Sequence, residues 1–242
     1  KKESMVKVLL AGAAGRIGAP LTQHLIDQGH EILACDIHSE NEWSIDCSYA
    51  QLNLLNTDKL CEIIEENGPF KAAINCSYPK NSAFGTAFEE LSLNDFQENL
   101  NLHLGAYFNL AQQIVPHFQK NNGGHLIQFS SIYGFVPPRF WIYEESKMDL
   151  PIEYSMIKAA IIQMTKYLAR RYPNQNLRFN CLSPGGILDN QNPQFLEKYK
   201  SYCSSKGMLN PEDLFGAVDF LLSDSSRYFQ GQNLTIDDGF SL

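Results

Sequence analysis

A tyrosine and a lysine, Tyr154 and Lys158, stand four residues apart in a stretch whose apolar positions recur at helical spacing. The apolar positions of residues 157–168 predict a helix that carries both side chains on one face. An ammonium near a phenol lowers the pKa of the phenol and makes it a usable proton donor or acceptor. The pair alone is weak evidence, because a solvated helix face often has a tyrosine and a lysine at this spacing.

A glycine-rich turn separates a predicted strand, residues 6–10, from a predicted helix. Gly12 permits a tight turn, Gly15 lets the backbone approach a pyrophosphate, and Gly18 lets the helix lie close to the sheet. Between these glycines, Arg16 and Ile17 fall in the first helical turn. The segment predicts a dinucleotide site at the N-terminus of this helix.

An acidic residue, Asp36, ends the second predicted strand, residues 31–35. A carboxylate at this distance from the glycines can accept hydrogen bonds from the adenosine ribose and would repel a 2′-phosphate. Arg16 is the counter-argument, because a guanidinium suits a 2′-phosphate as well as a pyrophosphate. We therefore expect NAD as the cofactor and regard NADP as less favoured.

The whole chain indicates one domain, residues 1–242, and a small-molecule partner. Its 242 residues carry a net charge of −8 with a pI near 5.2, and the scattered Lys and Arg side chains suggest no nucleic-acid or membrane surface. No apolar stretch approaches the roughly 20 residues of a spanning helix, and we expect a cytoplasmic protein. Six cysteines without Cys-x-x-Cys pairing predict reduced thiols and no metal site.

Predicted strands alternate with predicted helices along the chain. The strands are expected at residues 6–10, 31–35, 51–53, 71–75, 125–130, 177–182 and 233–236, and the main helices at 57–66, 94–120, 152–172 and from 211 onward. This order predicts an α/β fold with a doubly wound parallel sheet of about seven strands. Ligands of such sheets bind beyond the carboxyl ends of the strands. Gly12, Asp36, Asn75, Ser131 and Pro184 all fall there.

These motifs together resemble the short-chain dehydrogenase/reductase family over nearly the full length. The resemblance is carried by the glycine turn, Asn75, Ser130-Ser131, Tyr154-x-x-x-Lys158 and Ser183-Pro184-Gly185. It implies a three-layer Rossmann fold and a hydride exchanged between NAD(P) and a hydroxyl or ketone carbon. In the family pattern, Tyr154 exchanges the proton, Ser131 hydrogen-bonds the substrate oxygen, and Lys158 holds the nicotinamide ribose and lowers the pKa of Tyr154.

The same resemblance implies further site residues and an assembly. Cofactor contacts are implied for Asn53, Leu54, Asn75, Cys76, Ser77, Pro184, Gly185 and Ile187, in addition to the glycine turn, Tyr154 and Lys158. His103 stands where the family usually has an asparagine that organises a water beside the lysine, and a one-residue change of alignment would give this role to Asn101 instead. Family members commonly form dimers or tetramers through helices equivalent to residues 94–120 and 152–172.

Departures from the family pattern bear on the substrate. An insertion of residues 135–150 separates Ser131 from Tyr154 and predicts a substrate-recognition loop, in which Arg139 is a candidate for binding a carboxylate or phosphate and Trp141 or Tyr143 for stacking on a sugar. Residues 75–79 and 130–138 resemble a subgroup associated with flagellin modification and unusual sugars, which implies a sugar or sugar derivative. The glycine spacing resembles the branch that includes sugar epimerases and dehydratases. An NAD-retaining epimerase or dehydratase and a non-catalytic redox sensor remain alternatives.

Overall fold

The computed structural model describes residues 5–144, 150–173 and 176–242. Within these residues, seven parallel strands form one sheet in the order β3-β2-β1-β4-β5-β6-β7. The strands are β1 (Lys7–Ala11), β2 (Glu31–Asp36), β3 (Ser48–Gln51), β4 (Ala72–Asn75), β5 (Gly124–Phe129), β6 (Leu177–Pro184) and β7 (Asn233–Ile236). The predicted doubly wound parallel sheet is confirmed.

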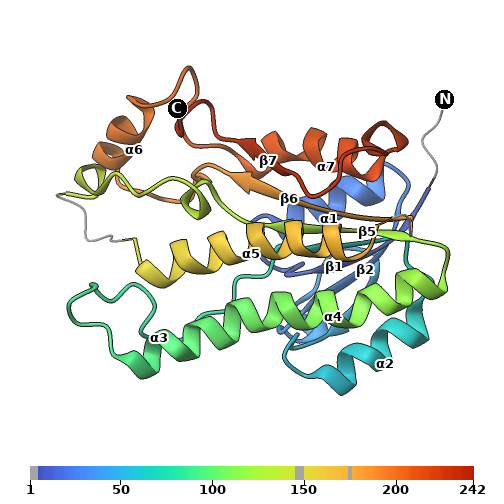
Figure 1. Cartoon of the computed structure of the whole chain (residues 1–242). Coiled ribbons are helices and arrows are strands. Elements are labelled where there is room, and N and C mark those ends of the chain that lie inside the picture. The colour runs from blue at the N-terminus through green and yellow to red at the C-terminus, as the bar shows by residue number, and fades with distance from the viewer. Residues whose placement is uncertain (1–4, 145–149, 174–175) are drawn as a thin grey trace.

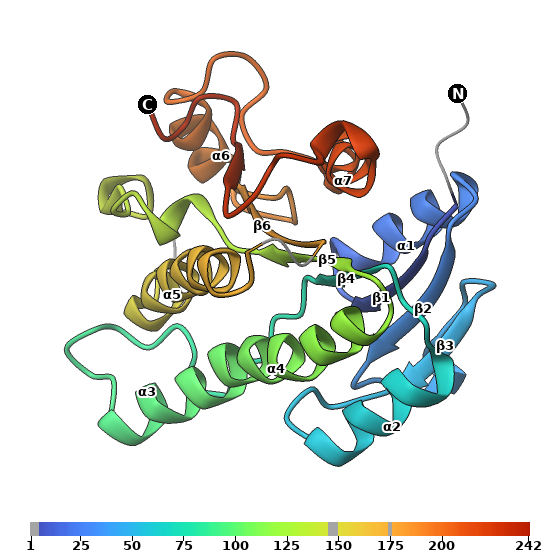
Figure 2. The same cartoon turned by 45° about the vertical axis from the view of Figure 1, so that its right-hand side comes forward.

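Helices cover both faces of the sheet, which gives three layers (Figures 1 and 2). The α-helices are α1 (Gly18–Asp27), α2 (Thr57–Asn67), α3 (Leu93–Asn99), α4 (Gly105–Lys120), α5 (Ile152–Arg171), α6 (Pro193–Lys200) and α7 (Phe215–Leu222). One face is covered by α2, α4 and α5, and the other by α1 and α7. No helix of the described chain is long and apolar enough to cross a membrane.

The central strands are apolar on both sides because they pack against helices on both faces. In β5, Leu126 packs with the side chains beneath α2 and α4, whereas Ile127 packs with those beneath α1 and α7. Leu9 and Leu10 of β1 divide between the same two clusters. This alternation follows from the two-residue period of a strand and fixes which face each side chain meets.

The predicted element bounds hold with three exceptions. The strand expected at residues 51–53 lies at Ser48–Gln51, on the sheet edge where partly exposed side chains weaken the apolar signal. Residues 193–200 lie outside the predicted helices and strands and form α6, which begins with Asn192 as its N-cap and Pro193 in its first turn. The helix expected from residue 211 begins as a 3₁₀ turn, Pro211–Leu214, before α7.

The long helix expected at residues 94–120 contains a π-helical turn. Residues Leu100–Leu104 form this turn between α3 and α4, with helical backbone angles on both sides, so the helix is continuous. A π turn holds more residues than an α turn and changes which side chains face the interior. It carries His103, which is buried to 1% exposure, while Asn101 is exposed.

The strand order changes direction between β1 and β4. From β1 the chain continues to β2 and β3 on one side, and from β4 it continues to β5, β6 and β7 on the other. The loops after these two central strands therefore diverge, which leaves room for a ligand at the carboxyl edge of the sheet. The site described below lies at this edge.

Candidate active site

A cavity of about 1030 Å³ lies at the carboxyl edge of the sheet. Its walls come from the glycine turn, the end of β2, the loop after β4, the end of β5, α5 and the loop after β6. Most predicted site residues line it: Gly12, Gly15, Arg16, Ile17, Asp36, Asn53, Leu54, Cys76, Ser77, Ser131, Tyr154, Lys158, Pro184, Gly185 and Ile187. Gly18, Asn75 and His103 do not line the cavity and lie immediately behind its wall.

The glycine turn joins β1 to α1 with a conformation that requires its first glycine. Gly12 has φ of 81°, and a Cβ at this position would lie 2.5 Å from the backbone nitrogen of Ser77. The turn therefore presses against the end of β4. No side chain caps the N-terminus of α1, which leaves backbone N–H groups and the positive end of the helix dipole facing the cavity.

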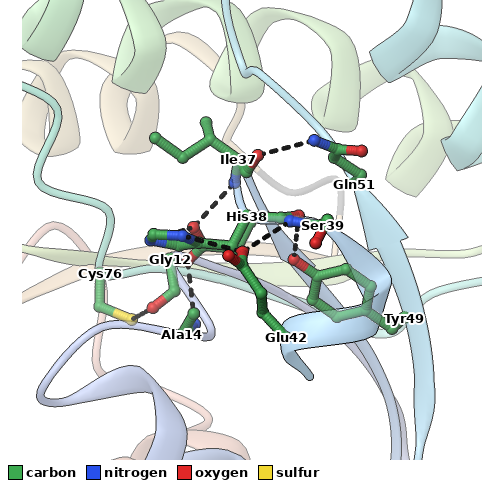
Figure 3. A network of polar contacts seen from close by, with 10 residues as sticks. Gly12, Ala14, Ile37, His38, Ser39, Glu42, Tyr49, Gln51 and Cys76 are labelled. Carbon is green, nitrogen blue, oxygen red and sulfur yellow. Dashed lines mark hydrogen bonds and ion pairs between the residues drawn. The ribbon is translucent and has the colours of Figure 1, made fainter.

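Asp36 accepts backbone hydrogen bonds on both of its oxygens, and Figure 3 labels the two donor residues, Ala14 and Ile37. Its Oδ2 accepts a hydrogen bond of 2.9 Å from the Ala14 amide, and its Oδ1 accepts one of 2.7 Å from the Ile37 amide. His38 Nε2 lies 3.8 Å from Oδ1, and His38 Nδ1 lies 3.4 Å from a carboxylate oxygen of Glu42. The His38 imidazole therefore lies between two carboxylates, of which Asp36 lines the cavity and Glu42 does not.

Arg16 bridges the glycine turn to the loop after β6. Its guanidinium donates from Nε to the Leu188 carbonyl over 2.9 Å, donates from Nη2 to the same oxygen, and forms an ion pair of 2.9 Å with Asp189. These contacts direct the guanidinium toward the loop after β6, whereas Asp36 lies at the end of β2.

The loop after β6 is tied to neighbouring elements at successive residues. The Gly185 amide donates to the Ile236 carbonyl of β7, and the Gly186 amide donates to the Tyr199 hydroxyl of α6 over 2.7 Å. Ile187 forms a short parallel bridge with Leu209. These bonds hold the loop beside the cavity.

The other predicted cofactor residues have local structural partners. Asn53 Oδ1 accepts from the Leu55 amide, and Asn75 Oδ1 accepts from the Ser77 amide and hydroxyl. Asn75 Nδ2 is buried and has no hydrogen-bond partner among the described residues. The Cys76 thiol donates to the Ala11 carbonyl, and burial raises its pKa to about 12, so it is no nucleophile at neutral pH.

Ser131 and Tyr154 meet at the floor of the cavity. The Ser131 side chain hydrogen-bonds the Tyr154 side chain. Ser130 points the other way and donates to the Lys158 carbonyl over 2.7 Å, as the alternation of an extended chain requires. Burial raises the pKa of Tyr154, and the bond from Ser131 only partly opposes it. The lowered pKa expected for this phenol is therefore not found in the ligand-free protein.

Lys158 lies beside the ring of Tyr154. Its Nζ donates to the Phe129 carbonyl over 3.0 Å and lies 5.6 Å from the centre of the Tyr154 ring. The Tyr107 and Tyr78 rings flank it at 5.3 and 5.7 Å. Burial lowers the pKa of Lys158 to about 7, so that its positive charge is partly lost at neutral pH.

His103, rather than Asn101, faces the lysine. Its Nε2 lies 3.3 Å from Lys158 Nζ, and its Nδ1 is buried without a hydrogen-bond partner. Burial, reinforced by the charge of Lys158, holds the pKa of His103 well below its ordinary value. A neutral imidazole can accept a hydrogen bond from the ammonium through Nε2.

The insertion packs against the C-terminal segment of the chain. Arg139 donates to the Phe240 and Leu242 carbonyls and lies over the Tyr202 ring at 4.0 Å, so its expected role in binding a substrate anion is not supported. Trp141 contacts Tyr202. Of the aromatic residues named in the insertion, Tyr143 lines the cavity, with its hydroxyl 2.9 Å from that of Tyr133. Residues 145–149 of the insertion, including Glu145, lie outside the described residues.

Several residues of the site were not assigned a role from the sequence. Tyr78 and Phe84, in the loop after β4, pack edge-on against each other and against Tyr154. Lys80 lies over both rings. The aromatic residues of a loop carry no periodicity, so only their place after a central strand could have indicated them.

Asp238 fixes a second loop at the cavity. Its carboxylate accepts hydrogen bonds from the amides of Ser205, Lys206 and Gly207 and from the Ser205 hydroxyl. These bonds, the one from Gly207 foremost, lower the pKa of Asp238 to about 2. The loop leads directly to Met208, which lines the cavity.

The residues present fit a nicotinamide dinucleotide. The uncapped N-terminus of α1 suits a pyrophosphate, and the Asp36 carboxylate at the end of β2 suits ribose hydroxyls. The unpartnered Asn75 Nδ2 and the buried Lys158 ammonium provide donors near the reacting end. No cluster of three or more metal-ligating side chains occurs in the described ranges.

Comparison with known proteins agrees with this geometry. A family model described as enoyl-(acyl carrier protein) reductase matches residues 12–241. The chain is 38% identical to post-translational flagellin modification protein A of Campylobacter coli, over 97% of this chain and 98% of the relative. It is 27% identical to a probable galactose dehydrogenase of Rhizobium meliloti, over 96% and 93% of the two chains.

A solved structure extends the agreement to three dimensions. A short-chain dehydrogenase from Leptospira borgpetersenii with bound NAD+ superposes with a TM-score of 0.89 at 31% identity, and the match covers 99% of this chain and 94% of that one. The chain belongs to the short-chain dehydrogenase/reductase family of oxidoreductases.

Proposed function

We propose that this protein is an NAD-dependent dehydrogenase or reductase that acts on a hydroxyl or ketone carbon of a sugar or sugar derivative. The observation that carries the proposal is the meeting of Ser131, Tyr154 and Lys158 in one cavity with the glycine turn and Asp36. A cytoplasmic setting, where NAD is abundant, is part of the proposal.

The chain's own residues divide the chemistry among them. The nicotinamide supplies or accepts the hydride when it is bound. Tyr154 Oη holds the proton that leaves or joins the substrate oxygen, and the Ser131 hydroxyl hydrogen-bonds that oxygen. Lys158 and His103, in contact behind the phenol, supply the positive charge and the hydrogen bonds that keep the phenol ready to give and recover its proton.

The proposal of a sugar substrate has support from the cavity wall and from the relatives. Tyr78, Phe84, Tyr143 and Phe195 line the cavity, and flat aromatic faces pack against the C–H faces of sugars. One relative takes part in flagellin modification by its name, and another is named a probable galactose dehydrogenase.

The choice of NAD over NADP has a direct test. Replacement of Asp36 in the variant Asp36→Asn should tighten NADP binding by about tenfold or more, because the carboxylate that repels a 2′-phosphate is gone. NAD binding should weaken severalfold, and titration of intrinsic fluorescence measures both affinities. Glu42→Gln is the control, because it removes the same charge from a carboxylate that is more exposed. Unchanged NADP affinity in Asp36→Asn would show that Asp36 does not select the cofactor.

The proposed activity is tested by cofactor titration and a substrate panel. NAD should bind more tightly than NADP, and absorbance of the reduced cofactor should rise with at least one member of a panel of sugars, sugar phosphates and nucleotide sugars. NAD binding without turnover on the whole panel would contradict a dehydrogenase acting on sugars.

A sugar epimerase or dehydratase is the second candidate, favoured by the spacing of Gly12, Gly15 and Gly18. Such an enzyme returns the hydride to its substrate. Purified protein would then carry NAD through gel filtration, and product would form without net NADH. Liquid chromatography of the released cofactor, together with analysis of sugar products, separates the two functions.

We also propose that a second copy of the chain packs on α4 and α5, as the family resemblance implies. Phe108, Met156 and Tyr167 are half exposed on these helices, and an apolar groove lined by Leu104 and Met164 lies between them. Light scattering should give the mass of a dimer or tetramer, whereas the mass of one chain would contradict the assembly.

A further inference from the structure

One cation of the cavity wall has no ionic partner. Lys80 is an exposed residue of the loop after β4 and is one of the residues that line the cavity. Its Nζ lies 5.5 Å from the centre of the Tyr78 ring and 5.6 Å from that of Phe84, positions typical of a cation–π contact. Within the described ranges, no carboxylate forms an ion pair with Lys80. The ammonium is therefore folded back over two rings at the cavity and retains hydrogen-bond donors for a ligand.

The other cationic side chains near the cavity are already engaged. Arg16 pairs with Asp189 and bonds the Leu188 carbonyl. Lys158 is buried and bonds the Phe129 carbonyl. Arg139, in the insertion, bonds carbonyls of the C-terminal segment. Among the lysine and arginine side chains of the described cavity wall, Lys80 is therefore the one whose donor groups are not used by contacts within the protein.

Negative charge is absent from the described wall around Lys80. The carboxylates that line the cavity among the described residues are Asp36 and Asp189. Asp36 lies at the end of β2, where the adenosine ribose is expected, and Asp189 is paired with Arg16. The wall formed by Tyr78, Lys80 and Phe84 therefore presents positive charge to a ligand. The carboxylates of Asp95 and Glu98 accept hydrogen bonds from the Asn81 side chain and do not line the cavity.

The backbone beside Lys80 is fixed to the residue beside Tyr154. The Asn81 amide donates to Asn99 Oδ1 over 2.9 Å, and Asn99 Nδ2 donates to Glu153 Oε1 over 3.1 Å. Asn99 and Glu153 are buried, at 1% and 0% exposure. Although the Lys80 side chain is long, its attachment point therefore keeps a set position relative to the phenol.

We propose that Lys80 binds an anionic group of the substrate, a phosphate or a carboxylate, carried away from the reacting carbon. The inference rests on the proposed function, in which the substrate is a sugar derivative that reacts at Tyr154. The Tyr78 ring contacts the Tyr154 ring edge-on, and the Lys80 ammonium lies over the Tyr78 ring. A single ring therefore separates the ammonium from the phenol. A sugar with its reacting carbon at Tyr154 and its anionic substituent at the far side of the sugar ring spans this separation.

Binding of three matched probes tests the proposal. Galactose, galactose 6-phosphate and galacturonate are titrated into NAD-saturated protein by calorimetry. In the unmodified protein, at least one anionic probe should bind about tenfold or more tightly than galactose, the size of one charge-assisted hydrogen bond. The phosphate and carboxylate probes distinguish which anion the site takes. The preference should fall as ionic strength rises.

Variants at position 80 assign the preference to the lysine. Lys80→Gln should reduce it to about twofold or less, and Lys80→Arg should keep most of it, because the charge remains. Lys120→Gln, at the exposed end of α4, is the control and should leave it unchanged. Equal affinity for all three probes in the unmodified protein, absence of detectable binding included, would overturn the proposal. An anion preference that survives in Lys80→Gln would overturn it as well.

Failure of this inference and failure of the proposed function give different results. Calorimetry reads the anion preference without turnover, whereas NADH formation that depends on Tyr154 reads the oxidoreductase activity. An active enzyme without the preference contradicts the Lys80 site alone. If the anion preference depends on Lys80 but the protein forms no NADH, the anion site is supported and the proposed dehydrogenase activity is contradicted.

Discussion

Replacement of Tyr154 by phenylalanine should reduce turnover by about 10²-fold or more, while NAD binding stays within about twofold. The variant Tyr154→Phe keeps the ring that contacts Tyr78 and Lys158 and removes only the hydroxyl that bonds Ser131. Without this hydroxyl, the site lacks the group that gives a proton to the substrate oxygen or takes one from it. Initial rates of NADH formation and a cofactor titration measure the two effects.

Tyr133→Phe is the matched control for this experiment. Tyr133 lines the same cavity and is largely buried, but its hydroxyl bonds the Tyr143 hydroxyl. Turnover should fall less than tenfold in this variant. A loss below tenfold in Tyr154→Phe would exclude Tyr154 as the essential acid or base.

Replacement of Lys158 by methionine should abolish most turnover and stabilise the ligand-free protein. Burial lowers the pKa of Lys158 from 10.5 to about 7, so the folded state binds the lysine proton less tightly than the unfolded chain does. At pH 7, Lys158→Met removes this cost and should raise the free energy of unfolding by about 1–4 kcal/mol. The Phe129 carbonyl keeps a hydrogen bond from the Tyr107 hydroxyl, whereas His103 Nε2 loses the ammonium as its partner, which reduces the gain.

The same lysine predicts a dependence of stability on pH. Between about pH 7 and 10.5 the unfolded chain holds a proton at Lys158 that the folded protein has lost. The contribution of this group to the free energy of unfolding therefore rises with pH in this window and is smallest below pH 7. Denaturant unfolding at pH 7 and pH 9 should show the rise in the unmodified protein and a smaller one in Lys158→Met. Lys166→Met, at an exposed position of α5, is the control. If the free energy of unfolding at pH 7 were lower for Lys158→Met than for the unmodified protein, the proposed cost of burying the lysine charge would be contradicted.

The sequence predicted those parts of the molecule that depend on local pattern. The parallel sheet follows from apolar runs such as Val8–Leu10 that alternate with helical segments, and the turn at Gly12 follows from the need for a positive φ. The opposite directions of Ser130 and Ser131 follow from the two-residue period of a strand. Each of these signals lies within a few residues of the feature that it predicts.

The features that the sequence did not predict arise from contacts between distant segments. The spacing of Tyr154 and Lys158 gave no measure of burial, and burial sets the direction of both pKa shifts. Arg139 is an arginine in a loop beside the site, but its partners are the carbonyls of residues a hundred positions later. Lys80 contacts two rings of its own loop, and its proposed role depends in addition on the pairing of Arg16 with Asp189 elsewhere in the cavity.

The π turn at Leu100–Leu104 makes the position of His103 sensitive to chain length rather than to side-chain identity. A π turn accommodates one residue more than an α turn, so removal of one residue would return α3 and α4 to a single regular helix. The apolar residues of α4, such as Leu110 and Ile114, would keep their places on the core, while His103 would be rotated relative to Lys158. A single deletion in this segment would therefore change the position of His103 in the site and keep the packing of α4 on the core. A substitution at any one position would not separate these two effects.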